Sequence, residues 1–241
     1  MFKYLPSIIP FEMKVFISQS NYIPWKGFFD AIQRADVFVL YDDMQYTKRD
    51  WRNRNQIKTP NGLQWLSIPV KVKGKYFQKI SETEVDDQDW PLNHWQCIVQ
   101  NYRKAPFFPE YGPRIEALYQ SATEKHLCQV NYRFLKAIAA MLDINTHFRW
   151  SSEFDLRGNK SEKLLHICQD LQATHYISGP SAQGYLEEDM FRQNGVDVLW
   201  MDYSNYPEYP QLFGTFNHFV SILDLLFNTG PAAADYLKFS R

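Results

Sequence analysis

The sequence predicts an α/β protein with a mostly parallel, Rossmann-like sheet and a helical insertion. A β-rich run at residues 14–18, a helical pattern at 28–35 and the apolar run VFVLY at 37–41 form a strand–helix–strand unit. Helices and strands alternate again over residues 161–203, and helical segments fill the middle of the chain. Strands that alternate with helices are typical of a parallel sheet.

The first strand–helix–strand unit has the features of a parallel pair. Phe28, Phe29, Ile32 and Ala35 recur at helical spacing between the two strands. The run at 37–41 is nearly all apolar, as strands buried on both faces are. A right-handed crossover then makes the two strands neighbours in the sheet.

The middle of the chain is predicted to be mostly helical. A third strand over residues 63–72 precedes helices over 90–105, 107–122 and 127–144, the first of which has Pro91 in its opening turn. We expect an insertion at about residues 88–145 within a single domain over residues 13–241. Residues 1–12 are expected to be an N-terminal extension, because Met13 opens the better strand MKVFIS.

The last third of the chain returns to alternating elements. A strand and loop over 148–157 precede a helix over 161–173, with a polar cap at Asn159 or Ser161. A buried strand at 174–178, the turn GPSAQG, a helix over 185–195 closed by Gly195, and a strand over 196–203 follow. A final helix is predicted over 216–230.

Composition limits the class of protein. The chain has 241 residues, 45% hydrophobic and 22% charged, with a net charge of −1, so we expect a globular protein that is not a general nucleic-acid binder. No apolar run approaches the ~20 residues of a membrane span. Cys97, Cys128 and Cys168 are far apart, which favours a reduced, cytoplasmic protein without a disulfide framework or structural zinc. No metal site is predicted, and the sequence identifies neither a cofactor nor an oligomeric state.

The stretch DDMQYTKRDWRNRNQIK, residues 42–58, is the first candidate for a binding site. Five basic residues follow its two leading carboxylates. Arg52 and Arg54 are two apart, so in an extended segment they would point the same way, and guanidinium groups bind phosphate or carboxylate with two hydrogen bonds. Asn53 lies between them and is a candidate donor to sugar hydroxyls. The alternative is a solvated, charged loop.

Two polar loops are expected to meet. One follows the first strand and contains Gln19, Asn21, Tyr22 and Trp25, and the other follows the second strand and contains Gln45 and Tyr46. Ligands of parallel sheets bind beyond the carboxyl ends of the strands. Aromatic rings stack on sugars or bases, and side-chain amides form hydrogen bonds with hydroxyl groups. These residues are therefore candidate substrate contacts. In the alternative interpretation, Trp25 seals the core.

The candidate acid–base groups are Asp42, Asp43 and His94. Either aspartate could bind Mg²⁺ beside a phosphate or act as a general base, or it could pair with Arg52 or Arg54. His94 could be a general acid or base, or it could pack within its helix. Tyr102 and Lys104 follow it, and Lys104 is a candidate second cation.

A second candidate anion site is the turn after the buried strand at 174–178. Ser178, Gly179 and Ser181 lie between that strand and a helix, where backbone N–H groups can meet an anion. The alternative is a tight connection. GPSAQ lacks the G-x-S-x-G pattern, which argues against a serine nucleophile.

Five stretches together resemble the WbqC-like protein family: QSNYIPWKGFFDAI, ADVFVLYDDMQYTKRDWRNRNQIK, NYRKAPFF, HYISGPSAQGYL and YPQLFGTFNHFVSILDLLFNTG. The resemblance covers nearly the whole chain from Met13. It implies a cytoplasmic role in tailoring carbohydrate for bacterial surface polysaccharide (O-antigen), and transfer of glycine or a related amino-acyl group onto a sugar has been suggested for the family. The family's first motif commonly begins His-Gln-Pro-Asn-Tyr. Here Ser18 stands in place of that histidine, so no histidine-dependent role carries over.

The expected function is a transferase acting on a nucleotide- or lipid-linked sugar, with a phosphate-bearing small molecule or sugar as the substrate. One alternative is a noncatalytic module that binds a nucleotide-sugar or an assembly partner. Another is a Mg²⁺-dependent nucleotidylyltransferase-like enzyme, to which ISGPS bears a distant likeness. Those enzymes use histidines in the first loop, and residues 18–27 contain none.

Overall fold

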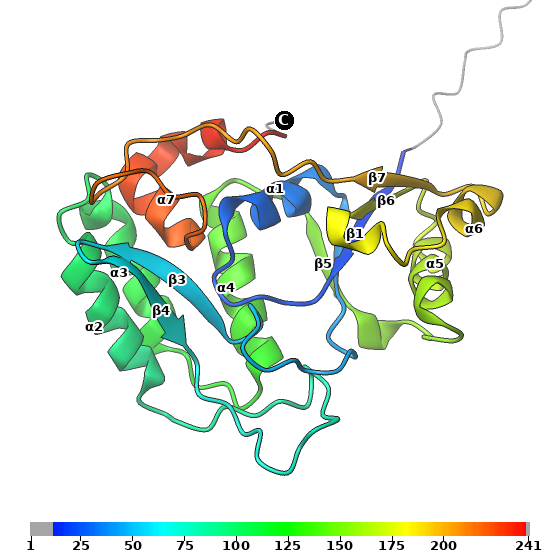
Figure 1. The fold of residues 1–241 in the computed structure, drawn as a ribbon, viewed down its shortest axis with the longest axis horizontal. Helices are drawn as coiled ribbons and strands as arrows, with labels where there is room; N and C mark the ends of the chain where they lie inside the picture. The colour runs from blue at the N-terminus through cyan, green and yellow to red at the C-terminus, as the bar shows by residue number, and fades with distance from the viewer. Residues whose placement is uncertain (1–11, 240–241) are drawn as a thin grey trace, which may run out of the picture.

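The computed structural model describes residues 12–239, so the expected N-terminal extension lies outside the described residues except for Glu12. Its main sheet contains β1 (Lys14–Ser18), β2 (Val37–Leu40), β5 (His147–Trp150), β6 (His175–Ser178) and β7 (Asp197–Trp200) in the order β5-β2-β1-β6-β7 (Figure 1). Every neighbouring pair is parallel. The prediction of an α/β protein with a mostly parallel, Rossmann-like sheet is confirmed.

The strand order reverses direction between β1 and β6. From β1 the chain passes through α1 (Lys26–Arg34) to β2, and β5 then adds outside β2. The helix α5 (Lys160–Asp170) carries the chain across to β6 on the other side of β1, and α6 (Glu188–Gln193) leads on to β7. In open α/β sheets the crevice at such a reversal is where ligands bind.

Alternating side chains of the strands build two separate cores. Phe16 and Phe38 point to one face, where their rings stack with centroids 5.1 Å apart and pack among residues of α1 and α4. Val15 and Ile17 point to the opposite face and pack against α5 and α6. The sheet therefore lies between two helical layers, which accounts for its apolar strands.

A separate two-stranded hairpin lies at one end of the molecule. It pairs β3 (Arg54–Thr59) with β4 (Gly62–Ser67) in antiparallel register. The last five residues of the basic stretch, 54–58, are thus a strand rather than a loop, because alternate side chains such as Asn55 and Ile57 are buried. The third predicted strand ends at Ser67, shortly before Pro69, which lacks a backbone donor.

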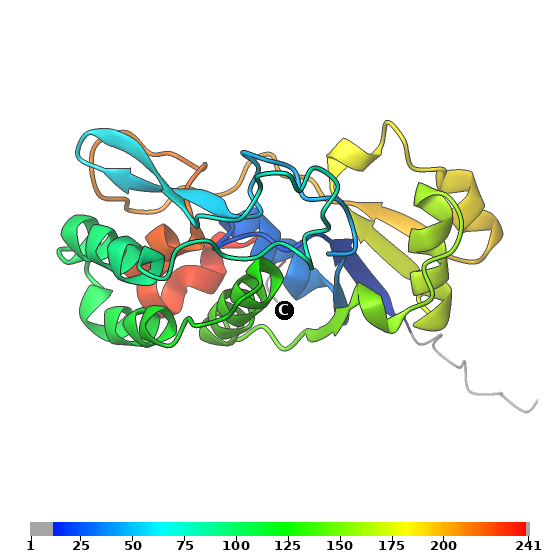
Figure 2. The same ribbon diagram turned by 90° about the horizontal axis from the view of Figure 1, so that it is seen from below.

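Three helices lie between β4 and β5, where the insertion was expected. They are α2 (Trp90–Tyr102), α3 (Phe108–Gln120) and α4 (Leu127–Met141). Together with α7 (Ile222–Thr229), α2 contacts the hairpin, and these elements lie at the opposite end of the molecule from α5 and α6 (Figures 1 and 2). The division into a single domain with an insertion stays a prediction.

Three short 3₁₀ helices complete the fold: η1 (Ser151–Glu153), η2 (Pro180–Ala182) and η3 (Gly230–Tyr236). The predicted cap of α5 is confirmed, since the Asn159 side chain accepts hydrogen bonds from two backbone N–H groups of its first turn. The final helix is shorter than predicted and begins after Ser221, whose hydroxyl caps it. Among the described helices, none is both long and apolar enough to span a membrane.

A candidate anion-binding site where the strand order reverses

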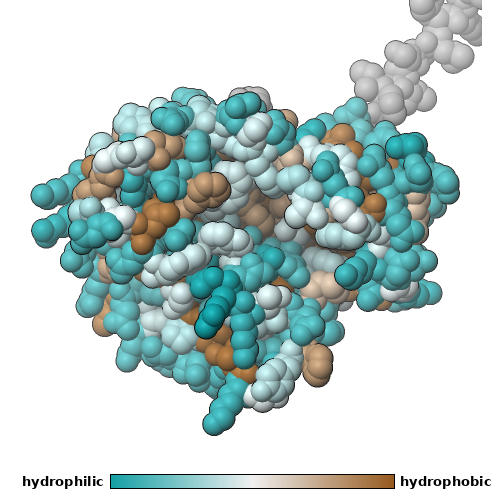
Figure 3. Space-filling view, viewed as in Figure 1, coloured by the Kyte–Doolittle hydropathy of each residue, from teal (hydrophilic) through white to brown (hydrophobic). Residues whose placement is uncertain are grey.

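A cavity of about 570 Å³ lies at the carboxyl ends of β1 and β6. Ser18 and Gln19 line it from the end of β1, and Ser178 and Gly179 line it from the end of β6. Figure 3 shows this face of the molecule hollowed near its centre, between α1 and η2. The cavity therefore occupies the place at which the sheet topology predicts a ligand.

The two polar loops converge at this cavity, as predicted. The Arg52 guanidinium donates to Oδ1 of Asn21, and the Tyr22 backbone N–H donates to the Trp51 carbonyl at 3.1 Å. From α4, the Asn131 amide donates to the Ser20 hydroxyl and to the Arg52 carbonyl, each at 2.9 Å. The loops after β1 and β2 are thus tied to each other and to the buried face of α4, which fixes the Arg52 backbone at the cavity.

Three cationic side chains line the cavity. They are Arg52, from the loop after β2, and Lys160 and Lys163, from the first turn of α5. Among the described residues that line the cavity, none is an aspartate or glutamate. A chain with a net charge of −1 therefore carries a locally positive cavity at the reversal of strand order. Burial lowers the pKa of Arg52, but Asp50 and Asp42 oppose the change, and an arginine stays charged at neutral pH.

Asp42 lies beneath the loops rather than in the cavity wall. It is 1% exposed, its Oδ1 accepts the Ser20 backbone N–H at 2.8 Å, and its Oδ2 has no partner among the described residues. Burial raises its pKa to about 6, against the hydrogen bonds from Ser20 and the charge of Arg52. Asp43 also lies outside the cavity lining and binds Lys79 at 3.3 Å and the Ser151 hydroxyl at 2.7 Å.

His94 is part of a buried aromatic cluster away from the cavity lining. Its Nδ1 lies 2.9 Å from the Tyr22 hydroxyl, and its Nε2 lies 3.2 Å from the Ser67 carbonyl. Burial lowers its pKa to about 4, so the imidazole is neutral at pH 7. Tyr22 is fully buried and also bonds the Tyr119 hydroxyl at 2.5 Å. The structure thus places Tyr22 and His94 in the core.

Arg54 does not share a site with Arg52. Residues 51–53 form a turn rather than an extended segment, so the expectation that both guanidinium groups point the same way is wrong. The Arg54 guanidinium lies 4.1 Å from the centre of the Trp65 ring and donates to the Arg49 carbonyl. Arg54 therefore packs against the hairpin and lies outside the cavity lining.

Four other candidates also lie outside the cavity lining. Asn53 accepts the Tyr46 hydroxyl at 2.9 Å and donates to the Ile68 carbonyl at 2.8 Å, which braces the loop. The Tyr102 hydroxyl donates to Asp224 at 2.7 Å in the core, and Lys104 is exposed just beyond α2. These contacts are structural, and any substrate role for these four residues stays a prediction.

Several lining residues were not predicted from the sequence. The turn candidates Ser178, Gly179 and Ser181 do line the cavity, together with Gln19, Asn21, Gln45 and Arg52. Lys160, Lys163, Tyr185 and Tyr203 join them without having been predicted. The signal for the lysines was their spacing of three at the start of a helix. That spacing indicates a cavity position only once α5 is known to carry the chain across to β6.

An aromatic slot of about 260 Å³ adjoins the cavity. Its walls include Trp25, Trp51, Tyr203 and Phe219, and it shares Asn21 and Tyr203 with the cationic cavity. A side chain at Gly27 would overlap the Trp25 indole, so glycine there lets this ring lie across the start of α1. Trp25 thus takes a wall position rather than sealing the core completely. Planar rings stack against such walls.

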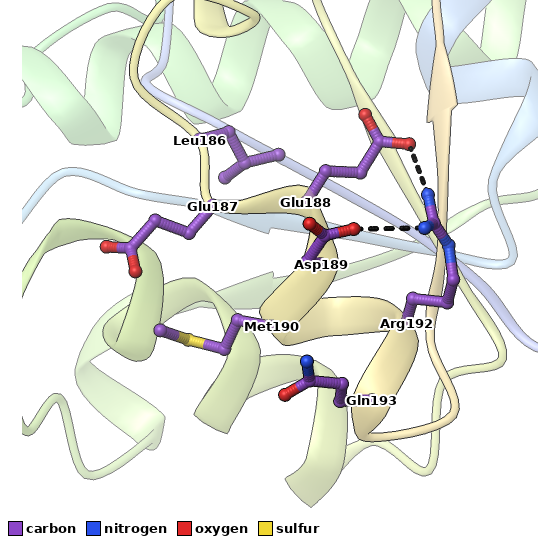
Figure 4. Close-up of a pocket in the computed structure, with 7 residues that line it drawn as sticks. All are labelled: Leu186, Glu187, Glu188, Asp189, Met190, Arg192 and Gln193. Atoms are coloured by element: carbon purple, nitrogen blue, oxygen red, sulfur yellow. Dashed lines mark hydrogen bonds and ion pairs between the residues drawn. The ribbon is translucent and has the colours of Figure 1, made fainter.

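A second hollow, of about 670 Å³, lies over α6 (Figure 4). All its lining residues come from residues 186–193, and Arg192 pairs with Asp189 at 2.9 Å and with Glu188 at 3.5 Å. Side chains of α6 and the two residues before it line this open depression, and two of its three acids, Glu188 and Asp189, are already paired with Arg192. We therefore place the candidate site at the cationic cavity, where several elements converge.

Comparisons with known proteins agree with the resemblance seen in the sequence. Residues 19–236 match the model of the WbqC-like protein family. The chain is 49% identical over 228 residues, 95% of its length and 99% of the relative's, to "Uncharacterized protein Rv1507c" of Mycobacterium tuberculosis. No solved structure matches it significantly. On the family match and this close relative, the chain belongs to the WbqC-like protein family.

Proposed function

We propose that the protein is a cytoplasmic transferase that tailors a phosphate-bearing sugar, nucleotide- or lipid-linked, in bacterial surface polysaccharide (O-antigen) biosynthesis. One observation carries the proposal: Arg52, Lys160 and Lys163 line one cavity that has no carboxylate among its described lining residues. Guanidinium forks and ammonium groups are the side chains that bind phosphate. A phosphate in this cavity would meet three positive charges.

The aromatic slot supports a ligand with a ring beside its phosphate. Because Asn21 and Tyr203 line both spaces, one molecule could place its phosphate among the cations and its sugar or base between Trp25 and Trp51. The protein would then hold the sugar at a fixed distance from the phosphate. Positioning of this kind makes a large contribution to transfer reactions, including the amino-acyl transfer suggested for this family.

A noncatalytic nucleotide-sugar-binding module is the second candidate. It is favoured by the positions of Asp42, Asp43 and His94, none of which lines the cavity. Among the described lining residues, the ionisable groups are the three cations and the tyrosines Tyr41, Tyr176, Tyr185 and Tyr203. A binding module needs no acid–base group, whereas a transferase would have to use these or groups on the substrate.

The test is a thermal-shift and calorimetric screen of nucleotide-sugars, nucleoside triphosphates, acyl-CoA and inorganic phosphate, each with and without Mg²⁺. A ligand at 100 times its dissociation constant adds ~2.7 kcal/mol of stability. We expect a nucleotide-sugar to bind, and Arg52→Gln and Lys163→Gln each to weaken that binding about tenfold. Arg54→Gln is the matched control, since Arg54 lies outside the cavity lining.

The outcomes separate the candidates. Loss of binding in Arg52→Gln and Lys163→Gln, but not in Arg54→Gln, supports the anion site. Conversion of a sugar after addition of an activated amino-acyl donor identifies a transferase, and binding without any conversion identifies a module. Release of pyrophosphate from a nucleoside triphosphate would point to a nucleotidylyltransferase. Equal binding by all three variants would overturn the proposed site.

A further inference from the structure

We propose that the connection between β4 and α2 docks on an anionic lipid surface through a basic-aromatic tip, defined as Lys73, Lys75, Tyr76 and Phe77. Tyr76 is 70% exposed and Phe77 is 87% exposed, the highest value among the large hydrophobic residues of the described chain. Two adjacent aromatic rings in water are costly unless they have a partner. Docking of this tip is independent of the function proposed for the cavity.

The tip is held in place by the rest of the protein. The residues that follow it, Gln78 and Ile80, are buried. The Gln78 carbonyl accepts the Tyr46 N–H at 2.9 Å, and the Ile80 N–H donates to the Met44 carbonyl at 2.9 Å. The chain is therefore anchored directly beside the exposed rings, which presents Tyr76 and Phe77 outward from a fixed base.

Exposed cations precede the two rings in the tip and occur in the loop that contacts Tyr76. Lys48, Arg49, Lys73 and Lys75 are exposed, and none of the four forms an ion pair with another described residue. The Lys48 ammonium lies 5.6 Å from the centre of the Tyr76 ring. Lys71 and Lys79, on either side of the tip, are instead paired with Glu84 and Asp43. The tip thus carries uncompensated positive charge in a chain with a net charge of −1.

This combination fits a lipid headgroup layer better than a protein partner. Aromatic rings bury at the boundary between headgroups and acyl chains, while lysines stay in the headgroup layer and attract anionic lipids. The cores of protein–protein interfaces are instead depleted in lysine. In Figure 3, pale and brown side chains lie among teal ones at the lower edge, where Figure 1 draws the connection between β4 and α2.

The tip is connected to the candidate site. Gln45 lines the cationic cavity, and its side-chain amide donates to the Tyr76 carbonyl at 2.8 Å. The backbone of Gln45 also forms an isolated β-bridge with Lys79. When the tip docks, a wall of the cavity is therefore held close to the lipid surface.

The experiment is co-sedimentation of the full chain with vesicles of phosphatidylcholine alone or mixed with phosphatidylglycerol. We expect binding to the anionic vesicles only, weakened by salt. The double variant Tyr76→Ser/Phe77→Ser should lower the partition coefficient roughly tenfold. Lys73→Gln/Lys75→Gln should lower it about thirty-fold, at ~1 kcal/mol for each charge near the surface.

Matched variants control for exposure and charge. Leu92→Ser removes another exposed apolar side chain, in α2. Arg103→Gln/Arg114→Gln removes two exposed charges, one at the end of α2 and one in α3. These variants should bind like the wild type, and urea unfolding checks that every variant folds. Absence of binding to anionic vesicles, equal binding to phosphatidylcholine alone, or equal losses in the controls would each overturn the proposal.

Discussion

The backbone N–H of Ser20 donates a hydrogen bond of 2.8 Å to Oδ1 of Asp42, and both residues are buried. This bond joins the loop after β1 to the end of β2, directly below the cationic cavity. It also means that a buried carboxylate supports the loop that carries Gln19 and Asn21. The charge state of Asp42 should therefore affect the stability of the protein.

Replacing Asp42 by asparagine should remove a pH-dependent loss of stability. Burial raises the folded pKa of Asp42 to about 6, above the ordinary value of about 4, so between these values the folded state binds more protons than the unfolded state. The free energy of unfolding then falls as the pH rises from about 4 to 6, by up to ~3 kcal/mol. The free energy of unfolding of the wild type and of Asp42→Asn should be measured by urea unfolding across this pH range. The difference between the two values should fall as the pH rises. A flat difference would contradict the prediction.

Replacing His94 by glutamine should act in the opposite direction. Burial lowers the folded pKa of His94 to about 4 from the ordinary value of about 6.5, so its neutral form contributes stability that is present above about pH 6.5 and lost as the pH falls toward 4. We expect His94→Gln to be less stable than the wild type at pH 7.5, with a smaller difference at pH 5. Calorimetric binding of a nucleotide-sugar should be unchanged. Loss of binding with full stability would instead favour a role for His94 in the site.

Gly27→Ala should disturb the aromatic slot without affecting the cation site. A Cβ at position 27 would overlap the Trp25 indole and displace it from the slot wall. Aromatic stacking contributes ~1 kcal/mol, so a nucleotide-sugar should bind about fivefold more weakly, while inorganic phosphate binds as before. Gly184→Ala is the control, because a Cβ there meets no atom within 4 Å. An equal loss for both ligands would show that the slot is not a separate subsite.

Tyr102→Phe should destabilise the fold and leave binding intact. The Tyr102 hydroxyl donates to Asp224 at 2.7 Å and accepts the Lys58 N–H at 3.0 Å, both in the core. Its removal leaves two buried groups with one partner fewer, at a cost of ~1–3 kcal/mol in the free energy of unfolding. Tyr132→Phe, which loses an exposed contact with Lys136, should change stability by less than ~0.5 kcal/mol. A change in ligand affinity with Tyr102→Phe would place Tyr102 at the site.

The sequence carried most of the information about the sheet and less about the site. The β-rich run at 14–18, the helical spacing at 28–35 and the apolar run at 37–41 were sufficient to predict β1, α1 and β2. The convergence of the two polar loops followed, because the carboxyl ends of parallel neighbours lie at one edge. These features depend on local patterns that survive in the folded chain.

The remaining site residues depend on tertiary structure that no local pattern contains. Arg52 and Arg54 separate because of a turn at residues 51–53, and Arg54 is held by Trp65 on the neighbouring strand. Lys160 and Lys163 reach the cavity because α5 crosses the sheet to β6. His94 was a candidate because histidines often titrate near neutral pH. Its burial depends on how α2 packs in the folded protein, which the sequence pattern does not contain.

The pairing of β1 with β6 has a consequence for how the protein is made. Met13 and Thr174, which are 161 positions apart, form a hydrogen bond beside this pair of strands. The central strand β1 therefore cannot pair with β6 until most of the chain has been synthesised. Contacts between such distant residues slow folding. A ribosome would have to release well over half of the polypeptide before the cavity exists, and a shorter nascent chain lacks the β6 wall of the cavity.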